Sequence, residues 1–179
     1  MNDQNPQPWP APILGMAGFS GSGKTTLLCK LIPLLTERGI RVAVVKHSHH
    51  TMELDKPGKD SHRLRESGAS QMLLASPNQV ALFLPQPDSD NLSAQLRLLD
   101  WANLDCVLVE GYRHSAIPKL EIHRPATGKP LLCETDENII AVACDEPLQR
   151  CPREQWPLND AGEVAERVIQ FLFPQQAGR

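Results

Sequence analysis

The sequence predicts an α/β protein with three layers, in which helices cover a mainly parallel central sheet and an antiparallel strand pair is added. Three observations support this fold class. A glycine-rich loop at 18–25 lies between a short apolar stretch and a segment with helical periodicity. A β-branched run at 40–45 follows that helix, which completes a β-α-β unit with parallel strands. Two short apolar runs, at 71–75 and 80–84, are separated by turn residues and predict a hairpin.

The first β-α-β unit opens with residues 13–17, which are apolar enough to form a buried strand. We expect the helix after the loop to run to about Arg38 and to end at Gly39, because glycine readily adopts the left-handed conformation that terminates helices. Pro33 lies inside this helix. Since leucines continue the apolar face after it, we expect a local bend there.

Apolar periodicity and turn residues predict the remaining elements. They are a short helix at 61–67, a second helix at 91–101, strands at 104–110, 119–123 and 138–143, and a closing helix capped by Asn159 and Asp160.

The chain divides by composition into three segments. Residues 1–11 are polar and rich in proline, which predicts a disordered lead-in. Residues 12–173 carry all the predicted elements and have the length of one domain. Residues 174–179 form a tail.

The charge balance bears on the partners and on the cellular compartment. The sequence has 18 lysines and arginines and 21 acidic residues, which gives a net charge of −3. This balance excludes a broad cationic surface for nucleic acid. No stretch has the length of a membrane span, and the N-terminus lacks the pattern of a signal peptide. The five cysteines form no C-x-x-C pair. We therefore expect a cytoplasmic protein with reduced thiols and with no nucleic-acid or membrane partner.

The loop at 18–25 reads GFSGSGKT and matches the phosphate-loop pattern G-x-x-x-x-G-K-[ST] at every fixed position. Its glycines let backbone N–H groups turn toward a phosphate, and the following helix adds its positive dipole end. Lys24 is expected to reach the β and γ phosphates, and the Thr25 hydroxyl to bind Mg²⁺. The pattern thus predicts a P-loop NTPase fold. The residues expected to hold the nucleotide are Gly18, Ser20, Gly21, Ser22, Gly23, Lys24, Thr25 and Thr26.

The strand at 104–110 ends in Glu110, where a P-loop enzyme carries an acid for Mg²⁺. Glu110 and Thr25 are therefore the predicted metal ligands. Asp105 lies five residues earlier, about 16 Å away along an extended strand, and is expected to be structural. For hydrolysis we expect Lys24 to stabilise the charge that develops on the phosphates, Glu110 to orient the metal or water, and Asp60 to position the attacking water.

Two further polar positions follow predicted strands. His47, His49 and His50 come directly after the strand at 40–45 and suggest a metal site, but we favour a mobile polar loop, because no second cluster of Cys or His follows. Asp145 follows the strand at 138–143, where a carboxylate can accept two hydrogen bonds from a guanine edge. Since the usual Asn/Thr-Lys-x-Asp base-reading motif is absent, the sequence leaves guanine and adenine open.

Four motifs together resemble one family. In order, GFSGSGKTTLL at 18–28, VKHSHH at 45–50, DKPGKDS at 55–61 and LVEGYRH at 108–114 are similar to the molybdopterin-guanine dinucleotide biosynthesis protein B (MobB) family over residues 12–173. The resemblance implies a homodimeric, weakly GTP-hydrolysing adapter. Such an adapter assists MobA, the guanylyltransferase that attaches GMP to molybdopterin.

Our hypothesis is thus that the protein binds GTP with Mg²⁺ and supports molybdenum cofactor maturation together with MobA and molybdopterin. Two other classes stay open. One is a metallochaperone-type GTPase that carries a metal on His47, His49 and His50. The other is a small-molecule kinase, whose loop after the second strand would position an acceptor hydroxyl.

Overall fold

The computed structural model of the chain describes residues 9–48, 58–85 and 90–175. The chain separates into two compact units. The first contains Met1–His47 and Leu92–Arg179, and the second contains Ser48–Asn91. Each unit is described by itself below.

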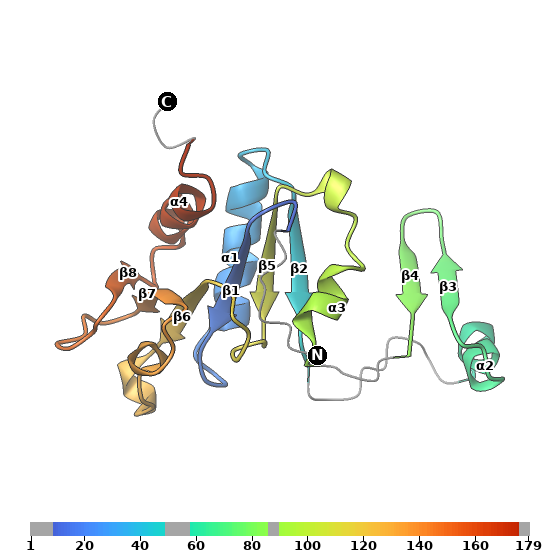
Figure 1. Cartoon of the computed structure of the whole chain (residues 1–179), viewed down its shortest axis with the longest axis horizontal. Helices are drawn as coiled ribbons and strands as arrows, with labels where there is room; N and C mark the ends of the chain where they lie inside the picture. Colours follow the sequence, from blue (N-terminus) through green and yellow to red (C-terminus); the bar gives the residue numbers. More distant parts are fainter. Residues whose placement is uncertain (1–8, 49–57, 86–89, 176–179) are drawn as a thin grey trace. The chain divides into compact units, whose positions relative to one another are not determined.

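The first unit is built on one parallel sheet, which confirms the predicted sheet type (Figure 1). Its middle strands are buried over their whole length. The strands at 13–17 and 106–110 are mostly apolar, as buried parallel strands usually are, whereas the strand at 119–123 also buries Lys119, Glu121 and His123. In spatial order the strands are β2 (Val42–Lys46), β5 (Cys106–Glu110), β1 (Ile13–Ala17), β6 (Lys119–His123), β7 (Ile139–Cys144) and β8 (Glu154–Pro157).

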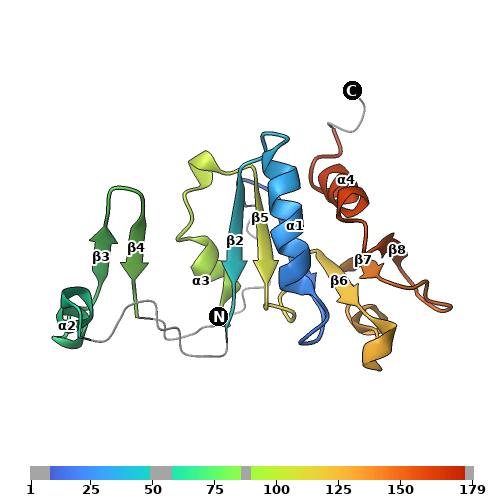
Figure 2. The same cartoon turned by 180° about the vertical axis from the view of Figure 1, so that it is seen from behind.

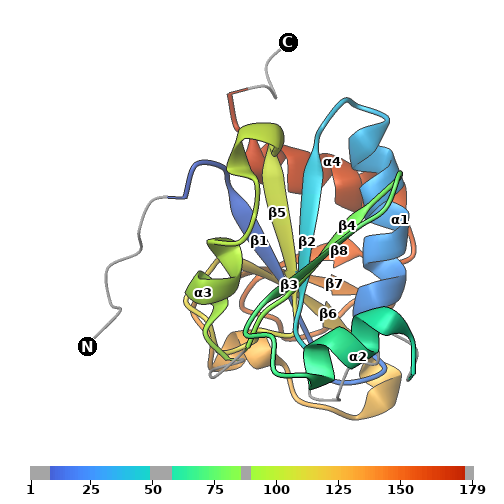
Figure 3. The same cartoon turned by 90° about the vertical axis from the view of Figure 1, so that its right-hand side faces the viewer.

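Helices cover both faces of this sheet, which confirms the layered α/β prediction (Figures 2 and 3). Helices α1 (Lys24–Thr36) and α4 (Ala161–Leu172) pack on one face, where Leu31 and Leu35 are fully buried. Helix α3 (Leu92–Leu96) packs on the other face against β5 and β1. Asp160 caps α4 as expected, because its carboxylate accepts a hydrogen bond from the Glu163 N–H at 3.0 Å.

The structure differs from the predicted elements at two places. The helix expected over 91–101 ends at Leu96, where the backbone hydrogen bonds tighten to i→i+3: the Leu99 N–H donates to the Leu96 carbonyl at 3.2 Å, and the Trp101 indole N–H donates to the same carbonyl at 2.9 Å. A 3-10 turn, Trp101–Asn103, follows. Strand β8 was not expected, because its sequence EQWP has no β-branched residue; burial of Trp156 holds it at the sheet edge.

The second unit contains helix α2 (Asp60–Glu66) and the antiparallel pair β3 (Met72–Ala75) and β4 (Val80–Phe83). The pair confirms the predicted hairpin, with Met72 opposite Phe83 and Ala75 opposite Val80. Large apolar side chains stay exposed on this unit, which indicates that it does not bury a core of its own. They are Leu64, Leu73, Leu74, Val80 and Leu82.

None of the helices in the described ranges is long and apolar enough to cross a membrane.

Candidate functional site

The glycine-rich loop connects β1 to α1 and passes close to β6. Gly18 has a φ of 145°, and a Cβ there would lie 2.5 Å from the Ile122 carbonyl oxygen and 2.7 Å from Ser22 Oγ. Gly23 directly precedes α1 in the left-handed conformation, with a φ of 101°. The loop therefore needs glycine at both positions, for lack of space at the first and for backbone conformation at the second.

The other predicted loop residues differ in exposure. Ser20, Gly21, Thr25 and Thr26 are exposed, so they are accessible to a ligand. Ser22 is 4% exposed, and its Oγ has no hydrogen-bond partner among the described residues. A buried hydroxyl without a partner is costly, and a ligand oxygen near the loop would satisfy it.

Lys24 reaches back over the loop from the first turn of α1. Its Nζ donates to the carbonyl oxygens of Gly18 and Phe19, each at 2.9 Å. An ammonium has three donors, so one remains for a ligand within the part of the chain that the structure describes. Burial lowers the pKa of Lys24, and the neighbouring Lys46 adds to this, while Glu110 opposes it.

The predicted metal ligands meet beside the loop. Thr25 Oγ1 donates to Glu110 Oε1 at 2.8 Å, and Glu110 is 8% exposed. The pairing of β2 with β5 sets Lys46 opposite Glu110. Lys46 Nζ consequently lies 3.2 Å from Glu110 Oε2 and 3.2 Å from Thr25 Oγ1.

The Lys46 ammonium thus occupies a cation position between the two residues expected to bind Mg²⁺. A hydroxyl and a carboxylate are oxygen donors that suit this ion. The described residues therefore fit a nucleotide with its metal: a loop that only glycine can form, a lysine with a donor to spare and an acid joined to the threonine of the loop.

Asp145 follows β7 and is tied to the loop through an arginine. Arg124, directly after β6, donates from Nη1 to Asp145 Oδ2 at 2.5 Å and from Nε to the Ser22 carbonyl at 3.2 Å. Asp145 Oδ1 is buried and has no hydrogen-bond partner within the described residues. Asp145 therefore keeps one acceptor oxygen at the end of the sheet where the phosphate loop lies.

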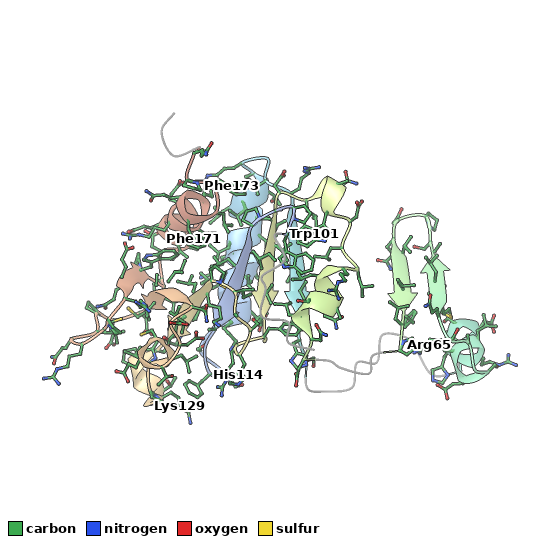
Figure 4. The ribbon with its side chains drawn as sticks, in the orientation of Figure 1. Arg65, Trp101, His114, Lys129, Phe171 and Phe173 are labelled. Carbon is green, nitrogen blue, oxygen red and sulfur yellow. The ribbon has the colours of Figure 1, made fainter. Side chains whose placement is uncertain are left out.

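Phe19 of the loop lies among cations. The Arg113 guanidinium is 5.7 Å and Lys129 Nζ 5.9 Å from its ring centroid, which are cation–π distances. In Figure 4, Lys129 and His114 both lie at the end of the first unit toward which its strands point.

Three functional candidates were therefore missed or understood only in part from the sequence: Arg124, Phe19 and the direct contact of Lys46 with Glu110. Only the strand order and register place them together.

Asp60 lies in the second unit, at the first position of α2. Its side chain is 96% exposed and forms an ion pair with Arg63 at 3.8 Å. The role of Asp60 in positioning water stays a prediction.

The predicted histidine cluster is covered only in part. The His47 ring packs against Tyr112 at 5.0 Å, and its backbone N–H donates to the Glu110 carbonyl at 2.8 Å. His49 and His50 lie outside the described residues. Within the described ranges, no group of three or more metal-binding side chains is found.

Asp105 lies at the opposite end of the strand from Glu110. Its Oδ1 pairs with Arg41 Nη2 at 2.9 Å, and its Oδ2 accepts from the Arg41 backbone N–H at 2.8 Å. This pair joins the residue just before β2 to the residue just before β5. Asp105 therefore lies at the end of the sheet away from the phosphate loop.

Comparison with known families gives one match over most of the chain. A family described as MobB, Molybdopterin guanine dinucleotide synthesis protein B, matches residues 13–145. The chain is 45% identical to the molybdopterin-guanine dinucleotide biosynthesis adapter protein of Haemophilus influenzae, over 90% of this chain and 89% of that protein. It is 42% identical to the Escherichia coli protein of the same name, over 92% and 95% respectively.

Solved structures and a second group of relatives extend this comparison. A crystal structure of molybdopterin-guanine biosynthesis protein B superimposes with a TM-score of 0.70 at 29% identity, covering 89% of this chain and 98% of the other. Over a shorter stretch, the urease accessory protein UreG of Trichodesmium erythraeum is 46% identical across 58 residues, which is 32% of this chain and 24% of that protein.

Proposed function

The chain belongs to the MobB family, and we propose from this membership that it is an adapter of molybdopterin guanine dinucleotide synthesis whose nucleotide is GTP with Mg²⁺. In this proposal it hydrolyses GTP slowly and assists a MobA-type guanylyltransferase that joins GMP to molybdopterin. It acts in the cytoplasm. The observation that carries the nucleotide part is the contact of Thr25 with Glu110 beside the Lys24 loop.

The chain's own residues suit the binding of a polyphosphate. The loop and the first turn of α1 offer backbone N–H groups to the phosphates, and Lys24 adds a charge-assisted hydrogen bond. Thr25 and Glu110 would hold Mg²⁺ once Lys46 leaves its position between them. When bound, this ion neutralises charge on the phosphates.

For the hydrolysis step we assign Asp60 to orienting water, with Lys24 stabilising the charge that develops on the γ phosphate. Lys24 is placed by its two loop hydrogen bonds. Its ammonium can therefore meet that charge with little rearrangement, which is how a preorganised donor lowers a barrier.

For the base, we assign Asp145 to guanine recognition. Arg124 donates to Asp145 Oδ2, and because each carboxylate oxygen has two lone pairs, Oδ1 and Oδ2 together can still accept from the two adjacent N–H donors of a guanine edge. Adenine offers no comparable pair of N–H donors on that edge. This assignment supports GTP over ATP.

A homodimer is the proposed assembly. The exposed leucines and Val80 of the second unit support it, because a small unit with this much exposed apolar surface gains stability by covering it. In a dimer of identical chains, the same patch would serve on both subunits.

A metallochaperone-type GTPase is the second candidate function, because part of the chain matches the urease accessory proteins UreG. In that case His47, His49 and His50 would bind one Zn²⁺ or Ni²⁺ per chain. Replacing all three with alanine would then abolish metal binding. Unchanged metal binding in the triple variant would remove this candidate.

The proposed function is tested by reconstituting dinucleotide synthesis. Molybdopterin, GTP, Mg²⁺ and the guanylyltransferase are combined with wild-type protein, with Lys24→Ala, or with neither. We expect wild-type protein to raise the yield of molybdopterin guanine dinucleotide and Lys24→Ala to do so less. Equal yields with and without the protein would contradict the adapter role. Equal yields with wild-type protein and with Lys24→Ala would contradict the proposal that the adapter must bind nucleotide to act.

A further inference from the structure

A cavity lies in the first unit, away from Asp145. It has a volume of about 490 Å³, within the range of small-molecule sites. One wall, with Arg113 and His114, belongs to the connection between β5 and β6, and His114 of this wall is labelled in Figure 4. The other wall is formed by residues 132–138, just before β7. Asn138 and Asp145 stand at opposite ends of β7, roughly 23 Å apart for seven extended residues.

The floor of this cavity is a buried, compensated ion pair. Lys119 is 1% exposed, and its Nζ lies 2.8 Å from Asp136 Oδ2 and donates to the Ser115 carbonyl at 2.6 Å. Asp136 Oδ1 accepts from the backbone and the side-chain amide of Asn138, at 3.0 and 3.1 Å. Each charge has its partner, so the floor is rigid and is not itself a site for an ion.

The walls, in contrast, keep groups available for a ligand. Arg113 donates from Nε to His114 Nε2 at 3.0 Å, and its two terminal nitrogens form no hydrogen bond within the described residues. Across the cavity, Asn138 uses its amide N–H on Asp136, which leaves its carbonyl oxygen as an acceptor. Glu137 is exposed beside it. One wall thus offers cationic donors and the other offers acceptors.

This division of charge matches a ligand with an anion at one end and an N–H donor edge at the other. A dinucleotide joins its two halves through phosphates, so the molybdopterin half must carry a phosphate. A pterin ring has a 2-amino-4-oxopyrimidine edge, which presents N–H donors to carboxylate and amide oxygens. Guanine shares this edge, so the ring alone does not distinguish the two ligands.

We propose that this cavity binds a phosphorylated pterin, with its phosphate on Arg113 and its ring donors on Glu137 and Asn138. The inference rests on the proposed function, which requires a pterin as well as a nucleotide. The Arg113 edge of the cavity reaches the nucleotide loop, because the Arg113 guanidinium is 5.7 Å from the Phe19 ring. One protein thereby holds both halves of the dinucleotide, in two separate sites.

The test uses neopterin monophosphate, whose pterin fluorescence reports binding to the full-length protein. Neopterin without phosphate, inorganic phosphate and GMP are titrated in parallel. We expect Arg113→Gln to weaken binding of neopterin monophosphate about 10-fold or more, the loss of a charge-assisted contact, and to remove the preference for the phosphorylated compound. Glu137→Gln is expected to weaken both pterins alike, about 3- to 10-fold.

Two controls separate the sites. Arg97→Gln changes an exposed arginine near α3 and should leave pterin binding unchanged. Lys24→Ala should weaken GTP binding while leaving the affinity for neopterin monophosphate unchanged. Circular dichroism of each variant checks that the fold is intact.

Three results would overturn the inference: no binding of neopterin monophosphate by wild-type protein, equal binding by wild type and Arg113→Gln, or displacement of neopterin monophosphate by GMP at equal concentration. If GTP still binds and still supports dinucleotide synthesis, only the pterin site is refuted. If neopterin monophosphate binds but GTP does not, the proposed function fails instead.

Discussion

Replacing Lys46 with methionine tests whether its ammonium stands in for a metal ion. Lys46 Nζ lies 3.2 Å from both Thr25 Oγ1 and Glu110 Oε2, the two groups expected to bind Mg²⁺. Without Mg²⁺, this ammonium is the charge that shields Glu110 from the phosphates of a nucleotide. With Mg²⁺, the divalent ion takes over this task. The substitution should therefore harm nucleotide binding mainly when Mg²⁺ is absent.

The magnitude follows from the exposure of the pair. The Lys46 side chain is 51% exposed and that of Glu110 is 10% exposed, so solvent screens the ion pair on one side. Pairs of this kind contribute about 0.5–1 kcal/mol, which corresponds to roughly a 2- to 5-fold change in affinity. We expect Lys46→Met to increase the ratio of the GTP dissociation constants in EDTA and in Mg²⁺ by this factor.

The assay is a titration of each variant with a fluorescent GTP analogue, in EDTA and in excess Mg²⁺. Lys30→Met is the matched control, because Lys30 is an exposed lysine further along α1. It should leave the ratio of the two dissociation constants unchanged. If Lys46→Met and wild type give the same ratio, Lys46 does not stand in for the metal and the reasoning is refuted.

Three further predictions address single residues. Lys24→Ala should weaken GTP binding by about 1.5–3 kcal/mol, the cost of a charge-assisted hydrogen bond, and calorimetry showing unchanged affinity would contradict its role at the phosphates. Glu110→Gln should still bind nucleotide but lose Mg²⁺-dependent GTP hydrolysis; equal phosphate release by both forms would remove Glu110 from the mechanism. The hydrogen bond from Arg41 lowers the pKa of Asp105 from 3.8 to about 2, so its stabilising effect is complete above pH 4 and is lost as the pH falls toward 2. Urea unfolding should therefore show a smaller loss of stability over that range in Asp105→Asn, and identical curves for both proteins would argue against the ion pair.

The parts of the fold that follow from local pattern could be predicted from the sequence. The phosphate loop, the strand before it and the helix after it are adjacent in the chain, and the motif fixes their order. The hairpin of the second unit was also predictable, because two apolar runs flank a short turn. Strand β8 was not, because its place depends on burial of Trp156 against distant residues.

The candidate site likewise combines residues that local sequence pattern predicts with residues that only the fold brings together. Glu110 was predicted because an acid at the end of an apolar strand is a recognisable pattern after a phosphate loop. Arg124 has no such pattern, and its contacts with Ser22 and Asp145 join residues far apart in the chain. The contact of Lys46 with Glu110 requires the register of β2 against β5, which hydrophobic periodicity alone does not specify.

The central claim is that this chain is a GTP-dependent adapter for a guanylyltransferase. Calorimetric titration with GTP and with ATP, each with Mg²⁺, tests it most directly when done with and without the MobA-type enzyme. We expect GTP to bind more tightly than ATP and its affinity to rise when the enzyme is present. A preference for ATP, or a GTP affinity that the enzyme leaves unchanged, would contradict the claim.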